Sequence, residues 1–421
     1  MGATRDTQGT DEAHGTSVAT ESTAGTTRRR FTALAGAGVA AMIAPGSTAA
    51  AAQRPAHRSR ARQPGAPSES AAPRPAFLGT YTSRPGGGAG LGLASYRPGS
   101  GEITVAGVLE GIANPSYLAL SPSRRMLYAV NEQAEGAVTA VRLRAGGPPR
   151  VLGSRSTGGA DPCHLSVHPG ERFLLSANYT GGSIAVHPIG RDGSLGAATD
   201  VVRHQGSGPD PERQGAPHAH MVISDPAGRY VLAVDLGTDS VHTYWLDERR
   251  GILRERGRAP TRPGAGPRHL AFHPSGEYAY LVNELDNTLV VCGYQPGTGT
   301  LEPGTPQATL PPGVRLGERN YPASVLVSAD GRFVYVSNRG HDSIAAFAVR
   351  RGGAGLRLLG VTPSGGAYPR HIAFDPTGTL LFAANQKSGS VSTFRVDCRT
   401  GRLARVEAAL AAPSPMCVLP L

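Results

Sequence analysis

The stretch "GPRHLAFHPSGEYAYLVNE", from Gly266 to Glu284, returns later in the chain as "YPRHIAFDPTGTLLFAANQ", from Tyr368 to Gln386. Each copy is an alternating apolar run, a turn such as His-Pro-Ser-Gly, and a second alternating run, which predicts strand, turn and strand. Four further copies begin at Asn114, Asp161, His218 and Tyr321. An internal repeat with a period of roughly 50 residues indicates an architecture built from one repeated supersecondary unit.

The repeat predicts an all-β, seven-bladed β-propeller. Each copy is followed by a third strand, such as Asn287 to Tyr294, and by a more variable fourth, and four strands per repeat make a propeller blade. Ser414 to Leu421 matches only the start of a repeat, and Phe77 to Pro98 matches only its later part. We expect the seventh blade to take its innermost strand from the C-terminus and its outer three from the N-terminus, which leaves no open edge. The alternative is an open β-solenoid, which needs no complementary half-repeats.

Composition agrees with many short strands joined by turns, since the 421 residues include 57 Gly and 35 Pro and only 5% are aromatic. The net charge of +11 comes from arginine, because Lys387 is the only lysine. Dense basic stretches lie only before residue 76, whereas nucleic-acid-binding proteins cluster their basic residues on the folded domain. We therefore expect no nucleic-acid partner. We also expect a monomer.

The N-terminal part is typical of an export signal and a linker. Arg28 and Arg29 precede Phe31 and a short apolar stretch from Ala33 to Ala44, in the order of a twin-arginine (Tat) signal. This stretch is well below the ~20 residues of a membrane span, and no later stretch is apolar enough. We expect a Tat-like signal over 1–52, a disordered linker over 53–76 and the propeller over 77–421, with export to the periplasm or beyond and no membrane contact in the mature form. A disordered tail with a chance arginine pair is the alternative.

The four cysteines have no metal-binding or CxxC spacing. Export would permit disulfides, but Tat substrates generally fold first in a reducing compartment. We expect buried free thiols at Cys163, Cys292, Cys398 and Cys417.

Residues that recur in every copy are expected to serve the blade. The first turn carries a glycine, and the second strand ends in Asn131, Asn178, Asp235, Asn283, Asn338 or Asn385, whose side chains can hydrogen-bond a turn. His168, His273 and Asp375, one step before the turn proline, are also expected to be turn residues.

Two places in the repeat vary from blade to blade, and we expect them to surround one mouth of the central channel. One is the residue after the repeated Asn: Glu132, Tyr179, Leu236, Glu284, Arg339 or Gln386. The other is the head of each inner strand: Ser116-Tyr117, Cys163-His164, His220-Met221, Arg268-His269, Ala323-Ser324, Arg370-His371 and Met416-Cys417. Mouth residues are expected to carry few packing contacts.

This ring predicts a catalytic set of histidines, arginines and one glutamate: His164, His220, His269, His371, Arg268, Arg370 and Glu284. Histidine can take a proton from water near neutral pH, arginine can hold an anion or an oxyanion, and glutamate can orient the base. Each histidine could instead tie neighbouring blades together. Several could bind a metal, but no spacing requires one, and we expect neither metal nor cofactor. No GxSxG elbow or P-loop is present.

At these residues the chain resembles the lactonase family of seven-bladed propellers, which includes propeller-type 6-phosphogluconolactonase and the fungal carboxymuconate lactonizing enzymes. Gln214 to Val241, with His-x-His and Asp-Leu-Gly-x-Asp, carries the most specific likeness, and Ala219 replaces a common proline. The resemblance implies a carboxylic-ester hydrolase that handles a lactone without a metal. It implies His164, His220, Arg268 and Glu284 as catalytic residues. The candidate substrate-binding residues are His218, His269, Arg370, His371, Glu132, Tyr179, Asp235, Arg339 and Gln386. A secreted propeller that binds a ligand without catalysis is the alternative.

The export signal is testable in the cell. Replacing Arg28 and Arg29 by Lys should retain the protein inside, because twin-arginine recognition needs both guanidinium groups. Fractionation and immunoblotting measure this, with Arg58→Lys/Arg60→Lys in the linker as the matched control. Normal export of the Arg28/Arg29 variant would contradict the signal.

Overall fold

The computed structural model describes residues 72–315, 319–407 and 409–421. The expected signal, residues 1–52, and the expected linker as far as residue 71 lie outside the described residues. The first strand begins at Arg74 rather than at the expected boundary of 77, because Arg74, Pro75 and Ala76 already pair with the neighbouring strand.

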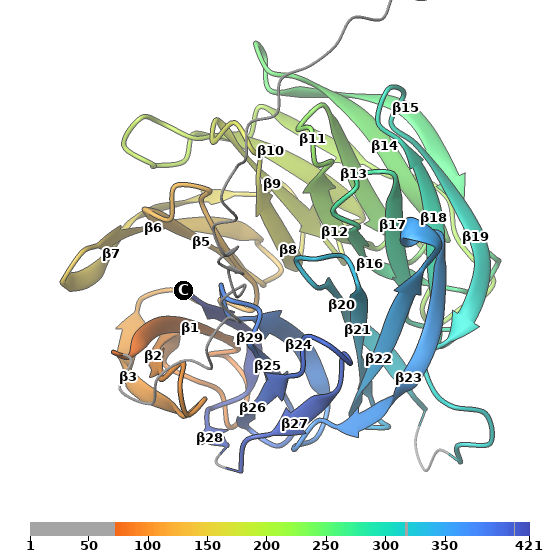
Figure 1. Ribbon diagram of the computed structural model, residues 1–421. Helices are drawn as coiled ribbons and strands as arrows, with labels where there is room; N and C mark the ends of the chain where they lie inside the picture. The colour runs from red at the N-terminus through yellow and green to blue at the C-terminus, as the bar shows by residue number, and fades with distance from the viewer. Residues whose placement is uncertain (1–71, 316–318, 408) are drawn as a thin grey trace, which may run out of the picture. The chain divides into compact units, whose positions relative to one another are not determined.

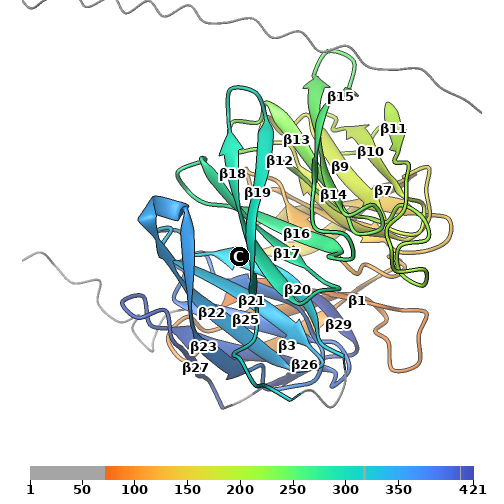
Figure 2. The ribbon, with the colours of Figure 1, turned by 90° about the vertical axis from the view of Figure 1, so that its right-hand side faces the viewer.

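The described residues form seven antiparallel sheets that stand side by side around a common centre, as Figures 1 and 2 show. The first three complete sheets, inner strand first, are β4 (Leu118–Leu120), β5 (Met126–Asn131), β6 (Ala137–Arg144) and β7 (Gly147–Ser156); β8 (Pro162–Val167), β9 (Phe173–Asn178), β10 (Ser183–Pro188) and β11 (Asp200–Arg203); and β12 (Ala219–Ser224), β13 (Tyr230–Asp235), β14 (Ser240–Asp247) and β15 (Ile252–Pro260). The next three are β16 (Pro267–Phe272), β17 (Tyr278–Asn283), β18 (Thr288–Gln295) and β19 (Thr300–Ala308); β20 (Tyr321–Val327), β21 (Phe333–Arg339), β22 (Ser343–Arg350) and β23 (Gly355–Pro363), with the 3-10 turn η1 (Arg351–Gly353); and β24 (Pro369–Phe374), β25 (Leu380–Asn385), β26 (Ser390–Val396) and β27 (Leu403–Arg405), with β28 (Leu410–Ala411) also on β26. The predicted seven-bladed, all-β fold is confirmed.

The seventh sheet closes the ring with both ends of the chain. Its order is β29 (Pro415–Pro420), β1 (Arg74–Thr80), β2 (Gly90–Tyr96) and β3 (Ile103–Glu110), so the inner strand is C-terminal and the outer three are N-terminal. In the antiparallel register Phe77 pairs with Leu419 and Leu78 with Val418. Leu78 and Val418 also pack with Phe382 and Val391 of the preceding blade, so the joint belongs to the apolar core.

A β-bulge at the head of the inner strands turns extra side chains toward the centre. Pro162 pairs with Asn178 but His164 pairs with Ala177, which leaves Cys163 as the additional residue. The same shift leaves His220, Arg268 and Arg370 as the extra residues of β12, β16 and β24. Bulges re-aim side chains, and here they present the blade-specific residues that the repeat comparison singled out.

The repeated Asn joins strands and successive blades, as predicted for a scaffold residue. Asn178 donates to the Ser183 hydroxyl at 3.0 Å and to the Thr157 carbonyl, which follows the outer strand of the preceding blade, at 3.4 Å. Asn338 makes the matching bonds to Ser343 and Thr309. The side chain that follows each of these residues is therefore held at a fixed place on the mouth.

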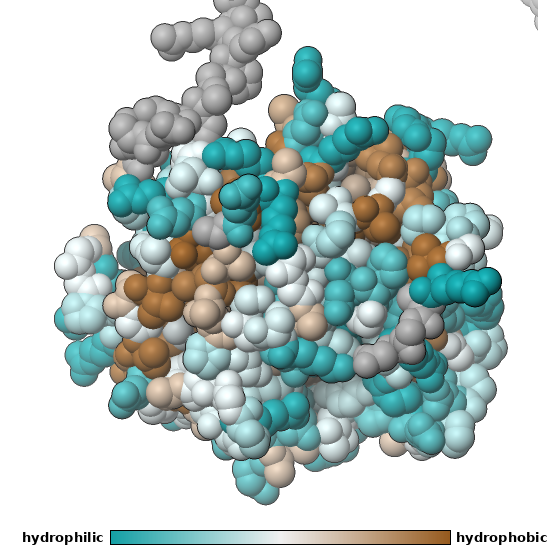
Figure 3. Space-filling model, turned by 90° about the horizontal axis from the view of Figure 1, so that it is seen from below, coloured by the Kyte–Doolittle hydropathy of each residue, from teal (hydrophilic) through white to brown (hydrophobic). Residues whose placement is uncertain are grey.

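The four cysteines are free, but only Cys163, Cys292 and Cys417 are buried. The expectation of burial is wrong for Cys398, which is exposed because it lies in the turn after β26 rather than in an inner or central strand. No helix in the described part of the chain has the length and apolarity to cross a membrane. Figure 3 shows a mostly polar face on which apolar side chains gather in two areas, at the left and at the upper right of the view.

Charge placed in the closing joint should prevent cooperative folding. Val418 is fully buried, so Val418→Asp places an unpaired carboxylate between blades, whereas Val105 on the outer strand β3 is 54% exposed. We expect loss of the thermal unfolding transition, followed by circular dichroism, for Val418→Asp. Val105→Asp should stay within about 0.5 kcal/mol of wild type. A Val418→Asp protein that melts like wild type would refute closure through β29.

Candidate active site

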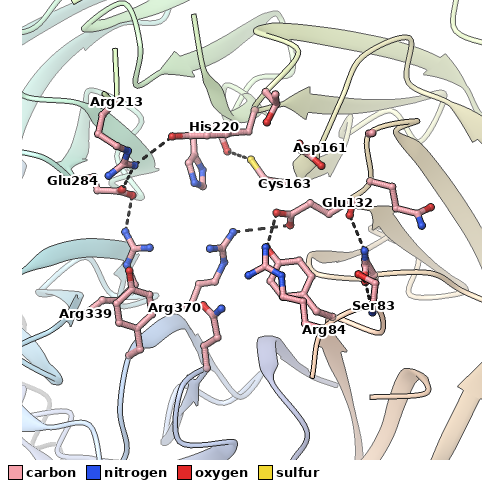
Figure 4. A pocket seen from close by; sticks show the side chains of 18 residues that line it. Ser83, Arg84, Glu132, Asp161, Cys163, Arg213, His220, Glu284, Arg339 and Arg370 are labelled. Atoms are coloured by element: carbon pink, nitrogen blue, oxygen red, sulfur yellow. Dashed lines mark hydrogen bonds and ion pairs between the residues drawn. The ribbon is translucent and has the colours of Figure 1, made fainter. Parts of the chain in front are cut away.

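A polar pocket of about 670 Å³ opens at the mouth where the inner strands begin. Figure 4 shows its side chains converging from around the ring. Of the residues predicted from the sequence, it is lined by Glu132, Tyr179, His220, Glu284, Arg339, Arg370 and Gln386. Bulged head residues other than Arg268 and the residues after the repeated Asn other than Leu236 thus meet in one cavity.

Glu284 is the anchor of the arginine side of this pocket. Its Oε1 accepts a hydrogen bond from Arg213 Nη2 at 2.6 Å, and its Oε2 accepts one from Arg339 Nη2 at 2.6 Å. Arg268 Nε lies 3.0 Å from the same Oε2, and Arg268 also donates to the Ala323 carbonyl. One carboxylate therefore holds three guanidinium groups from three different parts of the ring.

Burial and charge act in opposite directions on this cluster. Burial alone would raise the pKa of Glu284, but Arg339, Arg268 and Arg213 outweigh it and hold that pKa well below its usual range. Burial, with Arg339 beside it, lowers the pKa of Arg268 to about 9, so Arg268 is a cation at neutral pH. Glu284, Arg268 and His220 are all buried, so the expectation that mouth residues carry few contacts is wrong for them.

A second carboxylate holds the opposite side. Glu132 Oε1 accepts the Tyr81 hydroxyl at 2.5 Å, and Oε2 accepts the Ser116 hydroxyl. Arg370 Nη2 lies 4.0 Å from Oε2 and reaches into the middle of the pocket in Figure 4. Arg370 is thus oriented by Glu132 but keeps donors for a ligand.

His220 is the histidine that lines the pocket. Burial first, and then Arg268, lower its pKa well below the ordinary value, so its imidazole is neutral near neutral pH. Neither ring nitrogen has a hydrogen-bond partner among the described residues, and because Nδ1 is buried, Nε2 is the nitrogen that water in the pocket can reach. A neutral imidazole with an uncommitted nitrogen can accept a proton.

The other predicted inner-strand histidines lie outside the pocket lining. His164 contacts Tyr117 at 4.4 Å and His269 at 5.5 Å between ring centroids, and His371 contacts Tyr117 at 5.5 Å. Burial lowers the pKa of His164 to about 3. These rings from different blades pack on one another, which matches the blade-tying role left open by the sequence.

His218 and Asp235 support the pocket without lining it. His218 stacks on Tyr179, with ring centroids 4.6 Å apart. Asp235 is fully buried and accepts hydrogen bonds from the His218 and Thr238 amides, and its Oδ2 lies 2.6 Å from His204 Nδ1. Asp235 therefore joins its blade to the preceding one by side-chain hydrogen bonds, as the repeated Asn does in other blades.

Cys163, expected at the mouth but not as a site residue, also lines the pocket, and several lining residues were not predicted: Tyr81, Ser83, Arg84, Asn114, Gln133, Ala134, Asp161, Thr180, Arg213 and Tyr368. For some of these residues, the repeat contains a signal that could have identified them. Asn114, Asp161 and Tyr368 are the first residues of their copies, and these differ from blade to blade. Tyr81 follows Thr80, which pairs with Pro415 as the repeated Asn pairs with its inner-strand proline. Arg84 and Arg213 lie in loops that no other blade repeats.

Among the described residues, no three or more His, Cys, Asp or Glu side chains lie close enough together to hold a metal ion.

Comparison with known proteins identifies the family to which this chain belongs. The model of the family described as lactonase, 7-bladed β-propeller, matches residues 75–420. The chain belongs to this lactonase family.

Its relatives include proteins named for lactonase activity. A 6-phosphogluconolactonase of Bacillus subtilis is 36% identical over 344 residues, covering 81% of this chain and 97% of that protein. The structure of a periplasmic gluconolactonase of Pseudomonas aeruginosa is 31% identical with a TM-score of 0.78, covering 83% of this chain and 99% of that one. A putative 6-phosphogluconolactonase of Bacteroides fragilis is 33% identical with a TM-score of 0.77, covering 84% and 99%.

Removing the Glu284 charge should destabilise the fold. Glu284→Gln leaves three guanidinium groups without their buried counter-ion, so we expect a loss of about 3 kcal/mol or more at pH 7 by denaturant unfolding. Because the folded-state pKa of Glu284 is lowered, its contribution is present above the unfolded carboxyl pKa of about 4.3 and is lost on acidification. The deficit of the variant should therefore shrink below about pH 4.

Asp330→Asn is the matched control, because Asp330 pairs with Arg332 where both side chains are about half exposed. Such exposed pairs contribute about 1 kcal/mol or less. A Glu284→Gln variant as stable as Asp330→Asn would show that Glu284 does not anchor the cluster.

Proposed function

We propose that this protein hydrolyses a sugar lactone or another small lactone in the arginine-lined pocket. The observation that carries the proposal is the meeting of a neutral, uncommitted His220 with Arg370 and Arg339 in one polar cavity. The family and its relatives named as gluconolactonase and 6-phosphogluconolactonase support lactones as the substrate class.

Arg370 is proposed to face the carbonyl oxygen of the bound lactone. Guanidinium donors aimed at the position where negative charge develops stabilise the tetrahedral intermediate of acyl transfer. Arg268 was expected in this role, but its Nη1 donates to the Ala323 carbonyl, its guanidinium pairs with Glu284, and it does not line the pocket. Arg268 is better placed to position Glu284 and, through it, Arg339.

His220 is proposed as the base that activates water. The water oxygen bonds to the carbonyl carbon while its proton moves to Nε2 of the imidazole, and the carbonyl electrons go to oxygen. The ring carbon–oxygen bond then breaks, and the imidazolium returns the proton to the departing alkoxide to give a hydroxy acid. Charge developing on the substrate offsets the arginine charges that disfavour protonation of His220 in the free protein.

The same pocket can take an anionic substrate. Arg84, Arg213, Arg339 and Arg370 line it, and the carboxylates Glu132 and Glu284 engage only part of this charge. A phosphate or carboxylate on the lactone could bind guanidinium donors there. We also propose that the protein acts as a monomer and, on the twin-arginine pattern, outside the cytoplasm, where a neutral lactone would be the more accessible substrate.

Catalysis is tested with His220→Asn and Arg370→Lys. Loss of a base typically costs ~10²–10⁴ in rate, and loss of an oxyanion donor costs roughly 10²–10³ in kcat. We expect each variant to lower kcat for glucono-1,5-lactone by about a hundredfold or more, with melting measured on the same preparations. Arg97→Lys, in an exposed ion pair with Glu102, is the control and should keep wild-type rates.

If His220→Asn and Arg370→Lys both hydrolyse the lactone at the wild-type rate, the reaction does not take place in this pocket. Absence of hydrolysis by the wild-type protein on any lactone, with ligand binding retained, would instead make it a binding protein.

A further inference from the structure

The pocket has three carboxylates, and only one of them is free to meet a ligand. Both oxygens of Glu284 and both oxygens of Glu132 are engaged by protein donors. The half-buried carboxylate of Asp161 forms no hydrogen bond or ion pair within the described residues. Its backbone, in contrast, is fixed on both sides.

The fixed backbone makes Asp161 a pre-arranged group. Its amide donates to the Gln133 carbonyl at 2.8 Å, and its carbonyl accepts from the Tyr179 amide at 2.9 Å. Its φ of +51° lies in the left-handed region, which Asp and Asn tolerate better than most residues, and Pro162 follows directly. The structure therefore holds this side chain in place without using its charge.

The same backbone contacts gather uncommitted neutral groups around Asp161. Gln133 is bonded to it directly and Thr180 follows Tyr179; both are exposed, both line the pocket, and their side chains have no partner in the described part of the chain. Arg339 and Glu284 lie on the other side of the cavity in Figure 4. Glu284, Arg213 and Arg339 thus form an ion-paired cluster on one side of the pocket, whereas Asp161 and its uncommitted neighbours lie on the other side, which Arg84 also lines.

We propose that Asp161 determines substrate specificity by accepting hydrogen bonds from hydroxyl groups of a polyhydroxylated lactone. A lactone carbonyl and ring oxygen have no proton to donate, so only the hydroxyl groups or a water can satisfy a carboxylate. The developing oxyanion belongs beside Arg370 rather than beside a carboxylate, which directs the hydroxyl-bearing edge toward Asp161. This inference rests on the proposed function. It identifies the hydroxyl groups as the part of the substrate that binds on the Asp161 side of the pocket.

The test compares glucono-1,5-lactone with δ-valerolactone, which has the same ring size and no hydroxyl groups. Asp161→Asn and Asp161→Gly are suitable variants because both residues accept a positive φ. We expect a rise in KM of about ten- to hundredfold for glucono-1,5-lactone, the range for lost hydrogen bonds to a charged group, with kcat nearly kept. Kinetics with δ-valerolactone should be unchanged. Glu135→Gln, an exposed carboxylate outside the pocket lining, is the control.

Three results would overturn the inference. Equal loss of kcat on both lactones would make Asp161 a proton acceptor, unchanged kinetics on both would leave it without a role, and a lowered melting temperature that accounts for the loss would make it structural. Calorimetric titration with gluconate distinguishes a failure of this inference about Asp161 from a failure of the proposed lactone hydrolysis. If wild type hydrolyses neither lactone, the proposed function fails. Weaker gluconate binding by Asp161→Gly would still support the inference, whereas equal or absent binding would reject it.

Discussion

The pairing of β29 with β1 is the constraint on which the rest of the structure depends. It joins residues from opposite ends of the chain into one sheet, and through Leu78 and Val418 it packs that sheet against the preceding blade. The pocket takes side chains from every blade, so it exists only when the ring is closed. Tyr81, which follows the N-terminal strand, reaches Glu132 of the next blade and so couples closure directly to the position of Arg370.

Inside the closed ring, the chemistry follows from how each carboxylate is used. Glu284 and Glu132 neutralise and orient arginines, which allows several guanidinium groups to share a small cavity without mutual repulsion expelling them. The same positive surroundings, with burial, keep His220 neutral. Of the described carboxylates that line the pocket, Asp161 is left without a protein partner, and it lies on the side away from Arg339. A substrate with a carbonyl at one edge and hydroxyl groups at another matches this division.

Most of the fold can be predicted from the sequence, because each repeat corresponds to one blade and the two half-repeats show how the ring of blades closes. Part of the pocket follows from the same comparison: Glu284, Arg339, Gln386, His220 and Arg370 vary where their neighbours do not. The comparison missed the first residue of each copy and missed Tyr81, although both positions obey the same rule. It could not find Arg213 or Arg84, since their loops have no counterpart in other blades. It also could not separate His220 from His164, because only the bulge geometry decides which side chain reaches the cavity.

The most direct measurement is a crystal structure of the protein with the hydroxy acid product of a sugar lactone. The account predicts the ligand in the mouth pocket, with its carboxylate on Arg370 near His220 and its hydroxyl groups on Asp161. A ligand held elsewhere on the propeller, or one that leaves Arg370 and His220 untouched, would contradict it.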